Sequence, residues 1–305
     1  MKIIFLGTPD FALPSLRAVA ARHSVVGVVC QPDRPQGRKM ILTKPPVKAL
    51  AEELGLPVFQ FEKLRAEGRE ILASLGADIM VTCAYGQLLS QEILDLCPHG
   101  VINVHGSLLP AYRGAAPVQW AVVRGETETG VTVMQTALGL DCGDMILSKR
   151  TPIGKEETAG ELFARLSELG AQALLEALDL IETGRAVFTP QDEAKASYFP
   201  MLKKEDGHID FRRKGAEIVN LVRGVNPWPG AFCTLGGTLV KVWRAEAFSA
   251  EPAGGCGEIL SSDGRGLAVS CADGGVRLCE VQLAGGKRMS DLELLKGHRF
   301  SGRAE

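Results

Sequence analysis

Two polar side chains with catalytic potential stand in the apolar stretch Val101–His105. Asn103 and His105 are two residues apart, and side chains at this spacing in a strand project from the same face. His105 is followed by a glycine, at the strand end where parallel sheets place their ligands. An amide and an imidazole there have the chemistry to donate hydrogen bonds to a developing oxyanion. The alternative is a structural pair that satisfies backbone groups at a strand end.

Asp141 is a third residue with catalytic potential. It is bracketed by Gly139 and Gly143 between two apolar runs, a composition that suits a tight loop with its backbone open to a ligand. A carboxylate close to His105 would pair with a charged imidazole and take up a proton during catalysis. An ordinary hairpin turn is the alternative, because Gly and Asp are common turn residues.

The segment Gln31–Pro46 is long for a loop, basic and rich in proline. From Asp33 to Lys48 the chain carries five basic residues against one acid, and four of the five are Arg34, Arg38, Lys39 and Lys44. Such a loop on the ligand side of a sheet is suited to gripping a phosphate backbone. A solvated loop without a partner is the alternative.

The first turn after the N-terminal apolar run excludes the common nucleotide-binding signatures. The run Leu6–Pro14 begins like a nucleotide loop, but it lacks G-x-G-x-x-G, and Pro9 and Phe11 occupy the space that a pyrophosphate needs. P-loop, HExxH, GxSxG and kinase signatures do not occur either, and there is no CxxC pair. We therefore expect neither dehydrogenase chemistry nor a bound metal.

Alternating apolar and amphipathic stretches must position these residues. The expected strands are Lys2–Leu6, Val25–Cys30, Ile79–Tyr85, Val101–His105 and Gly130–Thr136. The expected helices are Val47–Leu54, Glu70–Leu75, Gln91–Leu96, Pro117–Val123 and a long one over Ala159–Glu182. Continuous Val and Ile runs separated by helices predict an α/β, Rossmann-like, mostly parallel sheet that is covered on both faces.

The pattern changes after Gly184. A polar stretch predicts a linker, and a short helix over Gly215–Val222 is followed by short strands with glycine turns. About five strands in some 75 residues fit a small OB-like β-barrel. Ser290, with Glu293 three residues later, predicts the start of a last helix. The predicted domains are 1–189 (catalytic), 190–208 (linker) and 209–305 (barrel).

Length and charge limit the classes of protein further. A chain of 305 residues exceeds the usual size of one hydrophobic core, so two domains are expected. The net charge of −2 means that a nucleic acid must be held by local basic patches. The N-terminal run is too short for a secretory signal, and most cysteines lie in apolar runs. We expect a cytoplasmic protein with reduced thiols.

The stretch VINVHGSLLPAYRGAAPVQWAV, together with GLDCGDM, resembles the 10-formyltetrahydrofolate-dependent formyltransferase family. FLGTPDFALPSL, QPDRPQGR, AYGQLL and NPWPGAF extend the resemblance over nearly the whole chain, to the branch that formylates methionyl-initiator-tRNA. The resemblance implies a Rossmann-like catalytic domain followed by an OB-like barrel. Two positions depart from it: Ala137, where members often have an acid, and Cys142, where they usually have Thr.

Carried over by position, the resemblance makes Asn103, His105 and Asp141 catalytic. It implies that 10-formyltetrahydrofolate, the formyl donor, is contacted by Gln87, Leu89, Ser107, Leu108, Leu109 and Pro110. It also implies that the initiator tRNA meets Arg34, Arg38, Lys39 and Lys44, while the linker and barrel hold its body. Residues 206–305 carry 13 Lys and Arg against 12 Asp and Glu, so charge supports the loop more than the barrel. We expect a monomer without a membrane partner.

Two alternatives stay open. A formyltransferase for a sugar amine or another small amine would need neither the basic loop nor the barrel. A non-catalytic RNA-binding protein on the same fold would not need Asn103, His105 and Asp141.

Overall fold

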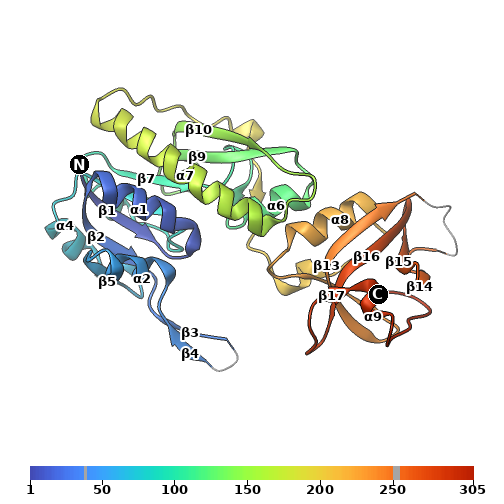
Figure 1. Ribbon diagram of the computed structural model, residues 1–305. Helices are drawn as coiled ribbons and strands as arrows, with labels where there is room; N and C mark the ends of the chain where they lie inside the picture. Colours follow the sequence, from blue (N-terminus) through green and yellow to red (C-terminus); the bar gives the residue numbers. More distant parts are fainter. Residues whose placement is uncertain (38–39, 250–254) are drawn as a thin grey trace. The chain divides into compact units, whose positions relative to one another are not determined.

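A computed structural model describes residues 1–37, 40–249 and 255–305 (Figure 1). The chain divides into two compact units. The first unit comprises Met1–Gly114, Thr129–Thr151 and Phe163–Phe199. The second unit comprises Ala115–Glu128, Pro152–Leu162 and Pro200–Glu305.

A seven-stranded sheet forms the centre of the first unit, with the strand order β10-β9-β7-β6-β1-β2-β5. The strands are β1 (Lys2–Gly7), β2 (Ser24–Cys30), β5 (Val58–Gln60), β6 (Ile79–Cys83), β7 (Val101–His105), β9 (Glu128–Gln135) and β10 (Met145–Pro152). The pairs from β5 through β7 are parallel, whereas β9 runs antiparallel to β7. The predicted mostly parallel sheet is confirmed.

Helices flank this sheet (Figure 1). They are α1 (Leu13–Arg22), α2 (Pro46–Glu53), α3 (Leu64–Glu67), α4 (Arg69–Ser74), α5 (Gln91–Leu94) and α7 (Ala159–Glu182), with a 3-10 turn η1 at Asp10–Ala12. Residues Ile3–Leu6 of β1 are fully buried, as expected for a strand that is covered on both faces. The long predicted helix is confirmed, and its apolar positions Leu162, Leu166, Leu174 and Leu178 are fully buried.

The basic segment after β2 contains a short hairpin and not only a loop. Strands β3 (Arg34–Gln36) and β4 (Ile41–Thr43) pair antiparallel, with Arg34 opposite Thr43. The apolar side chains of Met40, Ile41 and Leu42 are 68%, 61% and 67% exposed.

The stretch predicted as a linker carries regular structure at several points. A 3-10 turn η2 (Glu193–Lys195) precedes β11 (Tyr198–Phe199), which pairs in parallel with β8 (Arg113–Gly114). A second 3-10 turn, η3 (Lys204–Gly207), follows.

The second unit packs one helix on an antiparallel sheet and a second helix against the first. The helices are α6 (Pro117–Val123) and α8 (Gly215–Gly224), and the strands are β12 (Ala231–Leu235), β13 (Thr238–Phe248), β14 (Ile259–Asp263), β15 (Gly266–Cys271), β16 (Gly274–Leu283) and β17 (Met289–Ser290). The last helix, α9 (Asp291–Leu294), begins after Ser290, whose side chain accepts from the Glu293 N–H, so the predicted cap is confirmed.

The expected closed barrel is not confirmed in the second unit. The strand order β12-β13-β16-β15-β14 leaves β12 and β14 as two edges that do not pair with each other. Backbone bridges instead join the chain's last residues to both edges: Leu235 to Ala304, and Glu258, next to β14, to Arg303. The sheet itself is antiparallel and open.

Cys30, Cys83, Cys271 and Cys279 are buried free thiols, as expected. Within the described residues, no helix has the length and apolar character needed to span a bilayer.

Candidate active site

Strand β7 carries Asn103 and His105 to one end of the parallel part of the sheet. Asn103 stands beside Thr82 of β6, and its Oδ1 accepts a hydrogen bond from Thr82 Oγ1 at 2.8 Å. Because the oxygen is held in this way, the amide NH₂ points to the other side. In the described part of the chain, that NH₂ has no protein acceptor, so it is free to donate to a ligand.

His105 is 6% exposed and uses both ring nitrogens. Its Nε2 lies 2.9 Å from the backbone oxygen of Tyr112. A carbonyl oxygen only accepts, so Nε2 carries a proton. Its Nδ1 lies 3.6 Å from Asp141 Oδ2, which is longer than a hydrogen bond but short enough for an ion pair once the ring is charged.

The loop between β9 and β10 brings Asp141 to this strand end. Asp141 adopts a left-handed backbone with φ of 49°, a conformation that Asp tolerates better than most side chains and that often marks functional sites. Its Oδ2 also accepts from the Gly114 N–H at 2.9 Å. The three residues nominated from the sequence therefore meet at one place.

Gly114 is required by its surroundings. Its φ is 111°, and an added Cβ would lie 2.2 Å from the Phe199 carbonyl oxygen of β11. Any side chain would push β8 away from β11 and move the N–H that holds Asp141. The sequence pattern alone indicates no role for Gly114, Thr82 or Tyr112.

The run Ser107–Pro110 builds the turn after β7. Ser107 Oγ donates to the Ala111 oxygen at 2.7 Å. Buried Thr132 of β9 ties the turn to the sheet, because its hydroxyl donates to the Ser107 oxygen and accepts from the Leu109 N–H. The Ser107 hydroxyl is thus engaged within the protein, whereas Leu108 is half-buried.

Gln87 and Leu89 also support their own segment. Gln87 Oε1 accepts from the Leu64 N–H at 2.9 Å, and its Nε2 donates to the Phe61 oxygen at 3.1 Å. Leu89 packs against the core cluster that contains Tyr85. Any contact of these two residues with a ligand therefore falls to backbone atoms and to the exposed side of Leu89.

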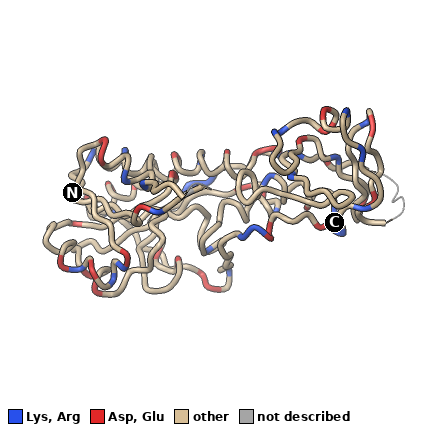
Figure 2. The backbone as a smooth tube through the Cα atoms, turned by 90° about the horizontal axis from the view of Figure 1, so that it is seen from below, with Lys and Arg blue, Asp and Glu red and all other residues tan. Residues whose placement is uncertain are grey.

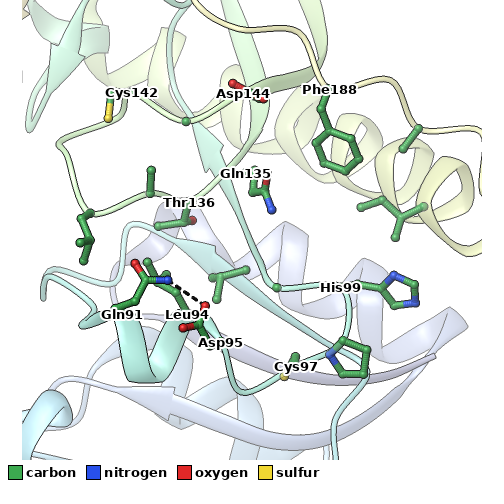
Figure 3. A pocket seen from close by; sticks show the side chains of 18 of the residues that line it. Gln91, Leu94, Asp95, Cys97, His99, Gln135, Thr136, Cys142, Asp144 and Phe188 are labelled. Atoms are coloured by element: carbon green, nitrogen blue, oxygen red, sulfur yellow. Dashed lines mark hydrogen bonds between the residues drawn. The ribbon is translucent and has the colours of Figure 1, made fainter.

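A cavity of about 1100 Å³ opens next to the Asp141 loop (Figure 3). Its wall includes Cys142, Gly143 and Asp144 from that loop, together with Gln135 and Thr136 at the end of β9. Other parts of the wall come from α5, from the start of β7 and from the segment after α7. Asn103, His105, Asp141 and the predicted folate contacts are not among its lining residues.

The basic residues nominated for tRNA binding have internal partners where the structure describes them. Arg34 pairs with Glu62 at 2.5 Å, and Lys44 pairs with Glu52 at 2.7 Å. Arg38 and Lys39 lie outside the described residues. Figure 2 shows Lys and Arg interspersed with Asp and Glu along the chain, which agrees with the low net charge.

The described residues contain no group of three or more His, Cys, Asp or Glu side chains arranged to hold a metal ion.

The chain is related to known sequences over nearly its full length. Residues 1–178 match the family model described as formyl transferase, and residues 201–299 match that of the formyl transferase C-terminal domain. A methionyl-tRNA formyltransferase of Geobacter sulfurreducens is 47% identical over 302 residues, which cover 98% of this chain and 95% of the relative. The one from Ruminiclostridium cellulolyticum is 44% identical over 304 residues, covering 98% and 97%.

Solved structures share the fold at low identity. An N-formyltransferase from Helicobacter canadensis, in complex with folinic acid and dTDP-3-aminofucose, aligns with a TM-score of 0.69 at 18% identity, covering 91% of this chain and 98% of that one. A glycinamide ribonucleotide transformylase from Symbiobacterium toebii aligns at 0.54 and 22%, covering 63% and 94%.

Proposed function

The chain belongs to the formyl transferase family, and we propose from this membership which of its residues carry the reaction. It transfers the formyl group of 10-formyltetrahydrofolate to the α-amino group of methionyl-initiator-tRNA. The product is N-formylmethionyl-tRNA, which starts translation.

The residue assignment rests on one observation: His105 Nδ1 faces Asp141 at 3.6 Å. Asn103 lies on the same strand, and its NH₂ has no acceptor among the residues that the structure describes. The amine attacks the formyl carbon, which forms a C–N bond and a tetrahedral oxyanion. The bond from that carbon to N10 of the folate then breaks, and N10 takes up a proton. Asp141 accepts the proton that the amine loses, directly or through water.

Asn103 and protonated His105 stabilise the oxyanion in this proposal. Because Nε2 already donates to the Tyr112 oxygen, Nδ1 is the ring atom that faces the reaction. The imidazolium carries a hydrogen on each nitrogen, so Nδ1 has one to donate, with Asp141 as its counter-ion. Asn103 contributes the N–H that Thr82 leaves free.

The cavity beside the Asp141 loop is our candidate for the folate's pterin end. Its volume of about 1100 Å³ lies slightly above the usual range of small-molecule sites, roughly 300–1,000 Å³. In this proposal, the segments Ser107–Pro110 and Gln87–Leu89 complete the folate site by backbone and apolar contacts. Replacing Ala137, on the cavity wall, by Phe should raise KM for 10-formyltetrahydrofolate and leave KM for tRNA unchanged. Ala73→Phe, on an exposed face of α4, is the matched control.

The hairpin β3–β4 is our candidate for the tRNA contact, through Arg34, Arg38, Lys39 and Lys44. The described ion pairs do not oppose this role. Arg34 and Glu62 are 59% and 61% exposed, and such surface pairs contribute only about 0–1 kcal/mol. Exchange of Glu62 for a tRNA phosphate therefore costs little.

We also propose an OB-like barrel for 209–305, closed by the bridges of the last residues and not by strand pairing alone, with 1–189 as catalytic domain and 190–208 as linker. The linker and the barrel hold the body of the tRNA, and the enzyme works as a cytoplasmic monomer. Limited proteolysis and light scattering test the boundaries and the oligomeric state.

The reaction is tested by incubating the chain with 10-formyltetrahydrofolate and charged initiator tRNA, and measuring N-formylmethionine. A dTDP-linked amino sugar serves as the competing amine. Formylation of the sugar and not of the tRNA would show that methionyl-tRNA is not the substrate.

The residue roles are tested separately. Loss of one oxyanion donor typically costs about 2.7–4 kcal/mol, a factor of about 10²–10³ in kcat. We expect a loss of that size for His105→Ala, with KM for the folate nearly unchanged. Turnover near that of the wild type would contradict the assignment.

A further inference from the structure

Arg113, in β8, is a fully buried arginine whose five N–H groups all have acceptors. Nε donates to Gln191 Oε1 at 3.0 Å, and Nη2 donates to the same oxygen at 2.8 Å. Nη2 also donates to Glu193 Oε1 at 2.7 Å. Nη1 donates to Glu193 Oε2 at 3.1 Å and to the Tyr198 hydroxyl at 2.6 Å. This guanidinium therefore has one orientation.

Gln191 connects this fixed guanidinium to the Asp141 loop. Its oxygen is taken by Arg113, so its Nε2 must point the other way. There it donates one hydrogen to the Asp141 backbone oxygen at 2.9 Å and the other to the Gly143 backbone oxygen at 2.8 Å. The reverse amide orientation would set its oxygen against two carbonyl oxygens and its NH₂ against the guanidinium, so it is excluded.

The loop needs such an anchor because little else covers it. Leu138 and Leu140 are 61% and 50% exposed, and the left-handed backbone at Asp141 is sparsely populated by residues other than glycine. The Gly114 N–H holds the Asp141 carboxylate, but it does not hold the Asp141 backbone. Gln191 bonds the carbonyls on both sides of Cys142 and fixes the direction in which Asp141 leaves the chain.

We propose that Gln191, oriented by Arg113, is a positioning residue for formyl transfer that sets the Asp141 carboxylate against His105. It does not meet the substrates. Its effect on the reaction passes through the backbone of the loop.

Gln191→Glu is the informative substitution. It keeps the size of the side chain and its pairing with Arg113. The NH₂ that donates to the Asp141 and Gly143 carbonyl oxygens is replaced by an oxygen, which cannot donate. A displacement of about 1 Å at a reacting group costs up to about 10²-fold. We expect kcat to fall about tenfold to a hundredfold, with KM for both substrates and Tm close to wild type.

Asp192→Asn is the matched control. Asp192 is the neighbouring residue, and its side chain caps the η2 turn by accepting from the Ala194 N–H without contacting the loop. This variant should keep its kcat. A wild-type kcat for Gln191→Glu would overturn the positioning role, as would an equal loss in Asp192→Asn.

Because this role rests on the proposed role of Asp141, the final experiment is a double-mutant cycle with Asp141→Ala. Unchanged turnover in Asp141→Ala alone would reject the proposed catalytic role. If Asp141→Ala is impaired, adding Gln191→Glu should cost less than about twofold more, because the two act as one unit. A full multiplicative loss would show that Gln191 acts independently of Asp141 and would overturn the inference, leaving the proposed function intact.

Discussion

The side chain of Asn103 has one defined orientation, because its oxygen is held by the Thr82 hydroxyl at 2.8 Å. Without that donor, the amide would be free to turn its oxygen toward the substrate. An oxygen in that place would repel the oxyanion that the NH₂ is proposed to stabilise. The role proposed for Asn103 therefore depends on the Thr82 hydroxyl of the neighbouring strand.

We predict a graded loss in two variants. Asn103→Ala removes the donor and should lower kcat by about 10²–10³. Thr82→Val has nearly the same shape and removes only the orienting bond, so its loss should be smaller, about tenfold. Single-turnover rates at saturating substrates measure both. An unaffected Thr82→Val enzyme would show that the amide is oriented by something else.

The residues proposed as catalytic were predictable from the sequence only where they share an element or a motif. Asn103 and His105 lie on one strand, and alternation alone places them on one face. Their partners are remote in sequence: Thr82 is 21 positions from Asn103, and Gly114 and Gln191 are 27 and 50 positions from Asp141. Nothing in the local sequence around Gln191 distinguishes it from a solvated glutamine, so this partnership required the fold.

At the scale of elements, two basic side chains of the hairpin β3–β4 and its flank, Arg34 and Lys44, form surface ion pairs. Hydrogen bonding to Glu52 raises the pKa of Lys44, so this side chain stays charged at all pH values relevant to tRNA binding. A tRNA phosphate would therefore meet a charged Lys44 and would compete with Glu52 for it.

We predict that the double variant Arg34→Gln, Lys44→Gln raises KM for methionyl-tRNA severalfold. The salt dependence of KM should also become shallower, by about one unit of log slope for each tRNA phosphate that is no longer neutralised. Initial rates at several KCl concentrations measure both effects. Arg17→Gln is the control, because Arg17, on α1, forms a similarly exposed pair with Glu53 at the end of α2. The same change in KM and in its salt dependence in both proteins would contradict the proposed contact between the hairpin and the tRNA.

In the second unit, Asp291 ties α9 to two strands. It is 1% exposed and accepts from Arg277 Nε at 2.7 Å and from the Leu267 N–H at 3.0 Å. Burial acts to raise the pKa of this carboxyl, but the bonds from Arg277 and from the backbone N–H groups outweigh burial and lower it. The charged carboxylate is therefore the form that stabilises the fold.

We predict that Asp291→Asn lowers the free energy of unfolding by about 2–4 kcal/mol near pH 7, because it breaks a largely buried pair. A lowered pKa means that this contribution is complete above the unfolded pKa, about 3.9, and is lost as the pH falls through the lower folded value. Urea unfolding at pH 7 and at pH 3 or below should show the two proteins converging. Asp263→Asn removes an exposed pair with Arg265 and should change little at pH 7.

The elements that were predicted best are those whose own hydrophobic pattern determines their type and bounds. The predicted bounds of α7, β1 and β7 agree with the observed bounds to within about one residue. Three-residue strands such as β4 and β5 were missed, because each is too short to show a period and is held by its neighbour in the sheet. The antiparallel direction of β9 was also missed, since direction depends on the connection and not on the run itself.

At the scale of the whole molecule, the last residues join the two free edges of the second unit's sheet. Glu305 and Thr234 exchange backbone bonds, the Ala304 N–H donates to Gly257, and the Ile259 N–H donates to Gly302. Ala304 is buried. Each backbone bond of this kind contributes about 1 kcal/mol.

We predict that removing residues 302–305 lowers Tm and makes the protein self-associate, because β12 and β14 then expose unpaired backbone groups. Calorimetry and light scattering at several protein concentrations measure these effects. Glu305→Gln keeps every backbone bond and serves as the control. A truncated protein with wild-type Tm and no concentration dependence would refute the prediction.

The division into two units does not follow the order of the sequence. The chain changes unit five times, after Gly114, Glu128, Thr151, Leu162 and Phe199. Helix α6 belongs with α8 in the second unit although its residues lie among those of the first. When two related genes are recombined at a single breakpoint, at least one of the two units will therefore contain segments from both parents. A crossover at residue 178, where the first family model ends, would separate the gene segment for Gln191 from that for Asp141. Chimeras of this family are therefore expected to work only when these remote segments are inherited together.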